Sequence, residues 1–128
     1  MTKKRAFKTK IFTKWMRKVG LRDQDLLLAI LEMETGLIDA DLGGDVYKKR
    51  IGLPGMGKRA GARTVVASKL YRKWFFLFGF LKNEKDNISD NELVHLQGAA
   101  SRLLCLSDQD LEEVILAGEL KELINNEK

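Results

Sequence analysis

The chain has 128 residues, with 23 Lys and Arg against 18 Asp and Glu, and a formal net charge of +5. This length suits one domain with a modest core. No apolar run reaches the roughly 18 residues that a membrane-spanning helix needs, and the basic first ten residues lead into no apolar segment of a signal peptide. The single Cys105 excludes an internal disulfide and fits a reducing cytoplasm.

The charges are segregated along the chain. Residues 1–22 carry nine bases and no acid, and residues 23–45 carry seven acids and no base. Residues 46–85 carry eleven bases and one acid, whereas residues 107–128 carry seven acids and two bases. Such a basic stripe favours a polyanionic partner, although a solvated surface without any partner would show the same pattern.

The first 45 residues predict a strand and two helices. "FKTKIF" at 7–12 alternates apolar and basic residues, as an edge strand does. A short helix over 14–19 ends at Gly20. A longer helix with Asp23 as N-cap follows, because apolar residues recur at helical spacing up to Gly36. "GLIDADLGGD" is then predicted to be a loop.

Three strands are predicted next, over residues 46–53, 62–70 and 73–81. A short connection joins the last two as a hairpin, whereas the connection over 54–61 is longer than usual and rich in glycine. The third strand, "WFFLFGFL" within 73–81, is apolar on both faces, so it should lie centrally and be covered by helices.

Two helices are predicted at the end of the chain. Ser89 with Glu92 forms a capping box before an apolar stripe, and Ser107 repeats the cap signature for a last, acidic helix over 107–124. His95 is expected on the surface or in the packing of the first of these helices, and Cys105 as a small core residue.

The sum is an α+β fold. It has a small, mainly antiparallel sheet of about four strands, two N-terminal helices on one face, and C-terminal helices nearby. A single domain over 1–128 is expected, with a core over about 5–105 and an acidic helical extension over about 106–128.

The glycine-rich loop resembles part of a nucleotide-binding loop without completing it. Gly52, Gly57 and Lys58 have the required spacing, but the next position is Arg59, where the motif needs a Ser or Thr hydroxyl for Mg²⁺. The residues that follow predict a strand instead of the helix whose N-terminus would meet the phosphates. A basic rim that holds a nucleic-acid backbone explains this loop better, because glycine lets a backbone approach closely.

Strand periodicity brings separate cations together. Lys48 and Arg50 share one face of their strand and Lys49 takes the other. If the three strands are neighbours, Arg63 and Lys82 converge with the first pair on one surface, where their mutual repulsion calls for a counter-charge such as a phosphate backbone.

This group offers one kind of chemistry. RNA cleavage can use the 2′-hydroxyl of the substrate as nucleophile, with a lysine among other cations accepting its proton and an arginine stabilising the charge on the phosphoryl oxygens. No Ser-His-Asp or Cys-His set is visible. The acids Asp39, Asp41 and Asp45 favour a loop with Asx turns over a metal site, and no cofactor is expected.

Three segments in this order resemble the RelE/HigB-like toxins of bacterial type II toxin–antitoxin systems, within the RelE/ParE superfamily. They are "GLIDADLGGDVYKKRI", "PGMGKRAGARTVVA" and "FFLFGFLKNEKDNIS" followed by an "EL" helix, and the resemblance covers about residues 5–105. Many such toxins are small basic proteins that cleave mRNA in the ribosomal A site without a metal.

The resemblance implies roles for individual residues. It implies a catalytic group formed by Lys48, Arg50, Arg63, Lys82 and Lys85. Lys58 and Arg59 of the glycine-rich loop, together with Lys49, are expected to be further RNA contacts. Two positions depart from the family pattern. Asn83 stands where RelE has a further arginine, and Ser89 stands where RelE has a tyrosine.

The function implied is a ribosome-dependent mRNA endonuclease that inhibits translation in the cytoplasm. The implied partners are an antitoxin, often with a helix-turn-helix domain, the ribosome and mRNA, and operator DNA only through the toxin–antitoxin complex. Two alternatives remain. One is a non-enzymatic inhibitor of DNA gyrase, as ParE relatives are, and the other is a nucleic-acid-binding module that has lost toxicity.

Overall fold

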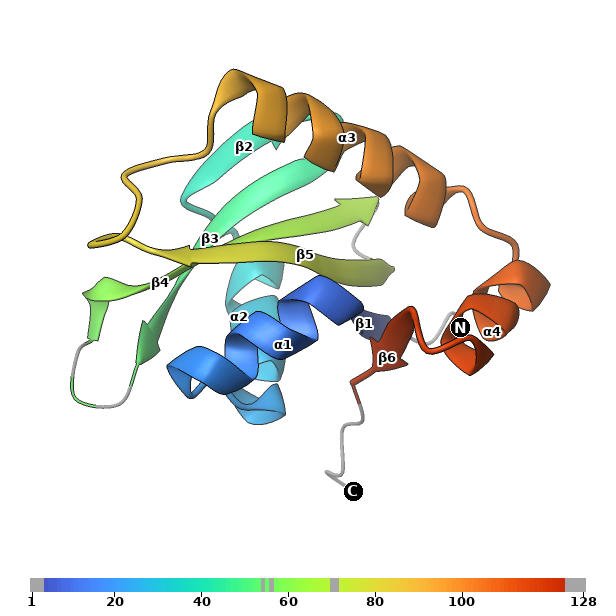
Figure 1. Ribbon diagram of the computed structural model, residues 1–128, viewed down its shortest axis with the longest axis horizontal. Helices are drawn as coiled ribbons and strands as arrows, with labels where there is room; N and C mark the ends of the chain where they lie inside the picture. Colours follow the sequence, from blue (N-terminus) through green and yellow to red (C-terminus); the bar gives the residue numbers. More distant parts are fainter. Residues whose placement is uncertain (1–3, 54, 56, 70–71, 124–128) are drawn as a thin grey trace.

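The computed structural model describes residues 4–53, 55, 57–69 and 72–123, apart from the side chains of 57–60. Four helices and six strands form in these residues (Figure 1). In chain order they are β1 (Arg5–Thr9), α1 (Lys10–Val19), α2 (Asp23–Glu34), β2 (Ala40–Gly43), β3 (Val46–Leu53), β4 (Gly57–Lys69), β5 (Lys73–Leu81), α3 (Asp90–Leu104), α4 (Asp108–Leu116) and β6 (Leu120–Glu122).

All six strands belong to one sheet, in the order β2-β3-β4-β5-β1-β6. Every neighbouring pair is antiparallel except β1 and β5, which run parallel. Parallel strands need a long crossover connection. Here α1, α2 and the strands β2 to β4 lie between β1 and β5 in the chain.

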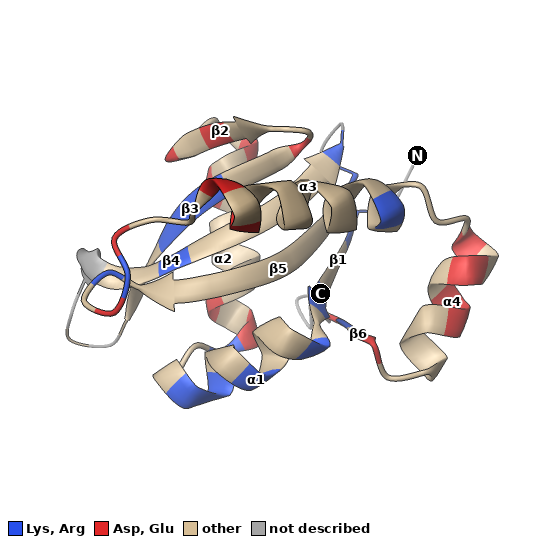
Figure 2. Cartoon of the chain, turned by 45° about the horizontal axis from the view of Figure 1, so that its top comes forward, with Lys and Arg blue, Asp and Glu red and all other residues tan. Residues whose placement is uncertain are grey.

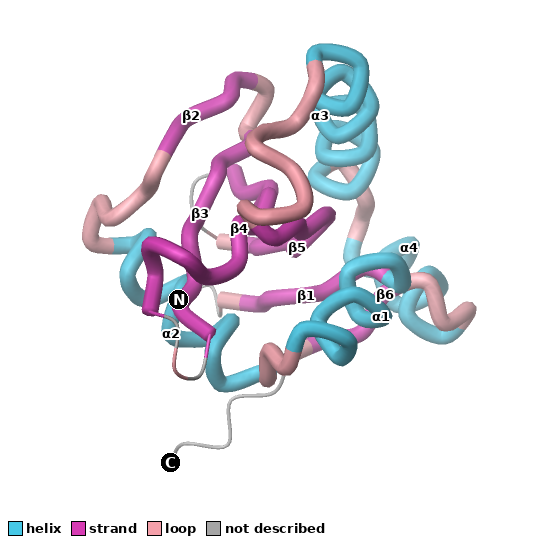
Figure 3. The backbone as a smooth tube through the Cα atoms, turned by 60° about the vertical axis from the view of Figure 1, so that its left-hand side comes forward, coloured by secondary structure: helices cyan, strands magenta, loops and turns pink. Residues whose placement is uncertain are grey.

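Helices cover both faces of the sheet, and each face has its own core (Figure 3). Side chains alternate along β5, so Trp74 and Phe76 pack under α1 and α2, whereas Phe75 and Leu77 pack under α3 and α4. We call these the α1/α2 face and the α3/α4 face. Leu111 of α4 is fully buried on the second of them.

Several predictions from the sequence are confirmed. The strands over 46–53 and 73–81 have the predicted bounds, and β5 lies inside the sheet with helices on both faces. The hydroxyls of Ser89 and Ser107 accept hydrogen bonds from the third residue of α3 and α4, and Glu92 completes the capping box. The fold is α+β with a mainly antiparallel sheet.

The predicted number of four strands is wrong, because β2 and β6 were not expected. The segment predicted to be a loop forms β2 beside β3. In the last predicted helix, Gly118 adopts a φ of +82°, and α4 ends at Leu116. The chain then adds β6 to β1, with Leu120 buried, so β1 is an internal strand and not the predicted edge.

Several local boundaries differ. The first strand, predicted over 7–12, is β1 over Arg5–Thr9. Thr9 caps α1, which therefore begins four residues before the predicted start. The N-cap of α2 is Arg22, one residue before Asp23. Most of the predicted 54–61 loop belongs to β4, where Gly57 pairs with Leu53 across the turn.

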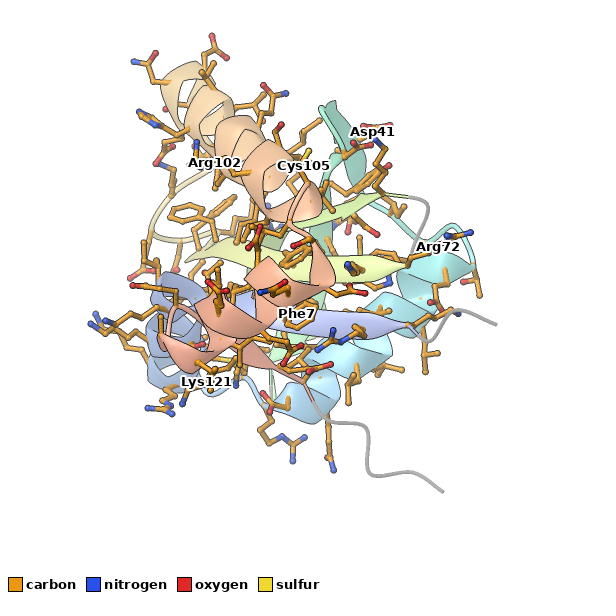
Figure 4. The ribbon with its side chains drawn as sticks, turned by 90° about the vertical axis from the view of Figure 1, so that its right-hand side faces the viewer. Phe7, Asp41, Arg72, Arg102, Cys105 and Lys121 are labelled. Atoms are coloured by element: carbon orange, nitrogen blue, oxygen red, sulfur yellow. The ribbon has the colours of Figure 1, made fainter. Side chains whose placement is uncertain are left out.

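Cys105 is not a core residue. It ends α3 as the C-cap and its side chain is exposed (Figure 4), which places the thiol at the surface and not in the apolar stripe that the helical spacing suggested. His95, by contrast, is exposed on α3, as one of the two predicted environments requires. Among the described residues, no helix is long and apolar enough to cross a membrane.

Gly79 of β5 tests how tightly α1 packs on the sheet. A Cβ atom at this position would lie 2.2 Å from the Trp15 ring, a distance that real contacts do not reach. We expect Gly79→Ala to lower the free energy of unfolding by about 1–3 kcal/mol, the usual cost of overpacking a core, as measured by urea denaturation. Gly98→Ala is the matched control, because a Cβ there meets only Arg102 Nη1, at 3.5 Å. Equal stability of the two variants would contradict this account of the packing.

Candidate functional site

Three of the predicted cations lie on one face of the central strands. Val46 of β3 and Val65 of β4 belong to the core of the α3/α4 face. Because side chains alternate, Lys48 and Arg50 project from that face of β3, and Arg63 projects from it on β4. Arg50 and Arg63 are direct cross-strand partners, so their side chains start from neighbouring positions.

Arg63 is the most sheltered member of this group. The residue is 8% exposed, and its cross-strand partner on the other side is Phe80 of β5. Its Nη1 donates to the carbonyl oxygen of Gly61 at 3.2 Å. A guanidinium is costly to desolvate without a counter-charge, so this side chain is held by the sheet in a position that an anion would stabilise.

Arg50 has a carboxylate partner that the sequence did not reveal. The Oδ1 atom of Asp39 accepts from Arg50 Nε at 2.8 Å, and Oδ2 accepts from the Arg50 backbone N–H at 2.6 Å. Partial burial of the carboxyl works toward a higher pKa, but the hydrogen bonds and charge of Arg50 outweigh it and hold the pKa of Asp39 below its usual value.

Lys82 and Lys85 follow β5 at the same end of the sheet. Lys82 comes directly after Leu81 and is exposed. Lys85 contacts both carboxylate oxygens of Glu92, at 2.6 and 2.8 Å. The hydrogen bond from Lys85, followed by that from the Ser89 backbone, lowers the pKa of Glu92. The capping box of α3 therefore ties down the chain segment that carries Lys85.

Lys49 lies on the opposite side of the sheet from these residues. It is 2% exposed, its Nζ lies 2.8 Å from Glu32 of α2, and it donates to the carbonyl oxygen of Leu37 at 3.0 Å. This burial corrects the expectation of an RNA contact, because the amine is enclosed between α2 and the sheet. Its role is to join α2 to β3.

Lys58 and Arg59 lie in β4, and their side chains are outside the described part of the structure. The backbone of this segment is a strand paired to β3 and does not open a helix, so it differs from a nucleotide-binding loop.

Some cations in the described part of the chain are paired with acids and others are not, and the candidate site contains both kinds. Within the described ranges, Lys48, Arg63 and Lys82 make no ion pair. The pairs that do form include Lys4–Glu34, Arg5–Glu122, Lys8–Asp23, Lys49–Glu32, Arg50–Asp39, Lys73–Asp108 and Lys85–Glu92. Figure 2 shows basic segments on β3 and β4 at the end of the sheet where the connection to α3 begins.

We define the candidate site as Lys48, Arg50, Arg63 and Lys82, with Asp39 and Lys85 beside it. Of the five residues assigned to catalysis, Lys48, Arg50 and Arg63 share one face of the sheet, Lys82 follows the neighbouring strand β5, and Lys85 is tied to α3 through Glu92. The arrangement presents positive charge with few internal partners, which suits a phosphate-bearing ligand.

The basic N-terminal segment lies elsewhere. Exposed Lys10, Lys14, Arg17 and Lys18 of α1 project from the helix that packs on the α1/α2 face, away from the site (Figure 2). Chain segments that are equally basic in composition therefore form two separate surfaces.

The acidic cluster has a structural explanation. Asp41 Oδ1 accepts from the backbone N–H of Gly43 at 2.9 Å, which is an Asx turn. Asp39 pairs with Arg50 instead. Asp45 has a φ of 64°, in the left-handed region that Asp tolerates in turns. Among the residues described, no three His, Cys, Asp or Glu side chains are grouped so as to hold a metal ion.

The two departures from the resemblance can also be placed. Asn83 is exposed in the turn after β5. Ser89 is occupied by helix capping, with its Oγ accepting from the Glu92 N–H at 3.1 Å, so the position where RelE has a tyrosine serves a structural purpose here.

Comparison with known proteins agrees with this geometry. The family model described as the RelE toxin of the RelE/RelB toxin–antitoxin system matches residues 4–123, from β1 through β6. A search of curated proteins found no match. Because the family match includes every strand of the sheet and the whole candidate site, the chain belongs to the RelE toxin family of toxin–antitoxin systems.

Proposed function

We propose that this toxin is a metal-independent endoribonuclease that cleaves mRNA on the ribosome and so inhibits translation. Membership of the RelE family supports a toxin with an antitoxin partner. The observation that carries the finer proposal is the cross-strand pair Arg50 and Arg63 on the same face as Lys48.

These residues suit the cleavage of a phosphodiester by its own 2′-hydroxyl. The 2′-oxygen forms a bond to phosphorus while the bond from phosphorus to the 5′-oxygen breaks, which leaves a 2′,3′-cyclic phosphate and a 5′-hydroxyl. Lys48 is the general base that accepts the proton of the 2′-hydroxyl. Arg50 and Arg63 stabilise the charge on the phosphoryl oxygens, and Lys82 is the general acid that supplies a proton to the 5′-oxygen. DNA lacks the nucleophile, so it is not a substrate.

The surroundings of the site have supporting roles. Lys85 orders the segment after β5 through Glu92, which sets the position of Lys82. Lys58 and Arg59, in the strand that begins at the β3–β4 turn, extend the cationic surface along the RNA backbone. Phe80 is the cross-strand neighbour of Arg63, and its ring packs at a tilt on that of Phe78, with the ring centroids 6.2 Å apart, which gives this part of the sheet a rigid apolar base.

The first test is direct. The purified chain is added to a reconstituted translation reaction with one defined mRNA, and new 5′ ends are mapped by primer extension. We expect cuts inside the translated region that depend on ribosomes and persist in excess chelator. Intact mRNA, with inhibition of gyrase supercoiling or with no effect, would overturn the proposal.

Arg63→Ala is expected to lower the rate of cleavage by about 10²-fold, the size found when one transition-state donor is removed. The matched control is Lys69→Ala, which removes an exposed cation from the last residue of the same strand. Thermal unfolding shows whether the fold persists, and Arg63→Lys separates charge from fork geometry. Full activity of Arg63→Ala would contradict its assignment.

Lys49→Met should affect stability and not chemistry. Removing the buried amine breaks its ion pair with Glu32 and its hydrogen bond to Leu37, which we expect to cost about 3 kcal/mol, the lower end for a broken buried pair because Glu32 is partly exposed. Chemical denaturation measures the loss, and the cleavage rate at low temperature should stay within about twofold of the unmodified chain, since the residue faces away from the site. A large loss of cleavage in a folded Lys49→Met chain would contradict this structural role and support Lys49 as an RNA contact.

A further inference from the structure

Asp39 is fixed to the strand that carries the candidate site. Its backbone N–H donates to the carbonyl oxygen of Lys48 at 3.0 Å, and its carboxylate accepts from the backbone N–H and the Nε of Arg50. The side chain is 19% exposed, whereas that of Arg50 is 44% exposed. Asp39 is thus the sheltered, immobile partner, and the arginine reaches outward from it.

The contact uses only part of the arginine. A guanidinium has five N–H donors, and Asp39 takes the one on Nε. Among the described residues, no acceptor engages the terminal nitrogens Nη1 and Nη2 of Arg50. These two nitrogens carry four donors that can meet two oxygens of a phosphate side by side.

The contact also changes the electrostatics beside Arg63. Like charges directly opposite each other on neighbouring strands repel, and Arg50 stands opposite Arg63. A carboxylate on the outer side of Arg50 offsets this repulsion. The lowered pKa of Asp39 keeps the group ionised at neutral pH.

We propose that Asp39 is a positioning residue that anchors Arg50 through Nε, so that its terminal nitrogens present a fixed fork to a phosphate of the RNA. The inference rests on the proposed function, because it names a determinant of the same site. The carboxylate does not touch the substrate, and it acts through Arg50.

If Asp39 instead competed with RNA for Arg50, the expected result would be different. A carboxylate that competed with RNA for Arg50 would weaken binding, so its removal would raise affinity. A positioning carboxylate strengthens binding, so its removal lowers both affinity and cleavage. Measuring the direction of change therefore decides between the two roles.

The experiment compares Asp39→Asn with Asp41→Asn. Asparagine keeps the shape at both positions, and at position 41 it also keeps the Asx turn to Gly43. Binding of a fluorescein-labelled single-stranded RNA is followed by anisotropy at low salt, and mRNA cleavage is followed in the translation reaction. For Asp39→Asn we expect about a tenfold loss in RNA affinity and in cleavage rate, as for one charge-assisted hydrogen bond. For Asp41→Asn we expect no change in either.

A double-mutant cycle with Arg50→Ala separates positioning from a general structural role. If Asp39 acts through Arg50, Asp39→Asn should cause no further loss in the Arg50→Ala chain. Arg50→Lys is the second variant, because lysine keeps the charge without Nε or the fork. Arg50→Lys should lose as much RNA affinity and cleavage as Asp39→Asn does, although Asp39 is intact. This variant tests the inference even if Asp39→Asn fails to fold.

Several results would overturn the inference. They are unchanged or tighter RNA binding by Asp39→Asn, an equal loss with and without Arg50, and full activity of Arg50→Lys. Intact mRNA with the unmodified chain would refute the proposed cleavage alone, since the RNA affinities would still decide the role of Asp39. A chain that binds no RNA at all would refute both.

Discussion

The register between β3 and β4 is the constraint on which the site depends. It sets Arg50 opposite Arg63, an arrangement that repulsion alone would disfavour. The register holds because both faces of these strands are committed to cores. A slip by one residue would turn Val46 and Val65 out of one core and Ile51 and Val66 out of the other. Apolar burial on two faces thus maintains a concentration of positive charge that the cations could not maintain themselves.

Carboxylates at the margin moderate this charge without cancelling it. Asp39 holds Arg50 on one side of the site, and Glu92 holds Lys85 on the other. Both acids are fixed by backbone hydrogen bonds as well, Asp39 from the N–H of Arg50 and Glu92 from the N–H of Ser89. The centre of the site, Lys48 and Arg63, has no such partner among the described residues. Its charge is left for a ligand from outside the chain.

Sequence periodicity predicted the parts of the fold that local patterns determine. β3 and β5 were placed to the residue because their apolar patterns are strong, and Ser89 and Ser107 because capping depends on adjacent residues. β2 and β6 were missed because they are only four and three residues long and gain their stability from a neighbouring strand. The acids and glycines around β2, in "GLIDADLGGD", indicate a loop. Pairing with a partner distant in the sequence overrides such weak local preferences.

The same limit applies to the site. The alternation of side chains along a strand was predicted correctly, whereas the pairing between residues distant in the sequence was not. The alternation of side chains correctly places Lys49 on the opposite face of β3 from Lys48 and Arg50, and the structure shows how the two faces differ. Lys49 is enclosed against Glu32, whereas its two neighbours face the region where RNA is proposed to bind. The sequence assigned Asp39 to a loop with Asx turns, and its ion pair with Arg50 was not predicted because the two residues lie eleven positions apart in the chain. Of these three consecutive basic residues, Lys49 forms a buried ion pair with Glu32 while Lys48 and Arg50 remain on the site, and the packing of α2 against β3 explains why Lys49 is buried.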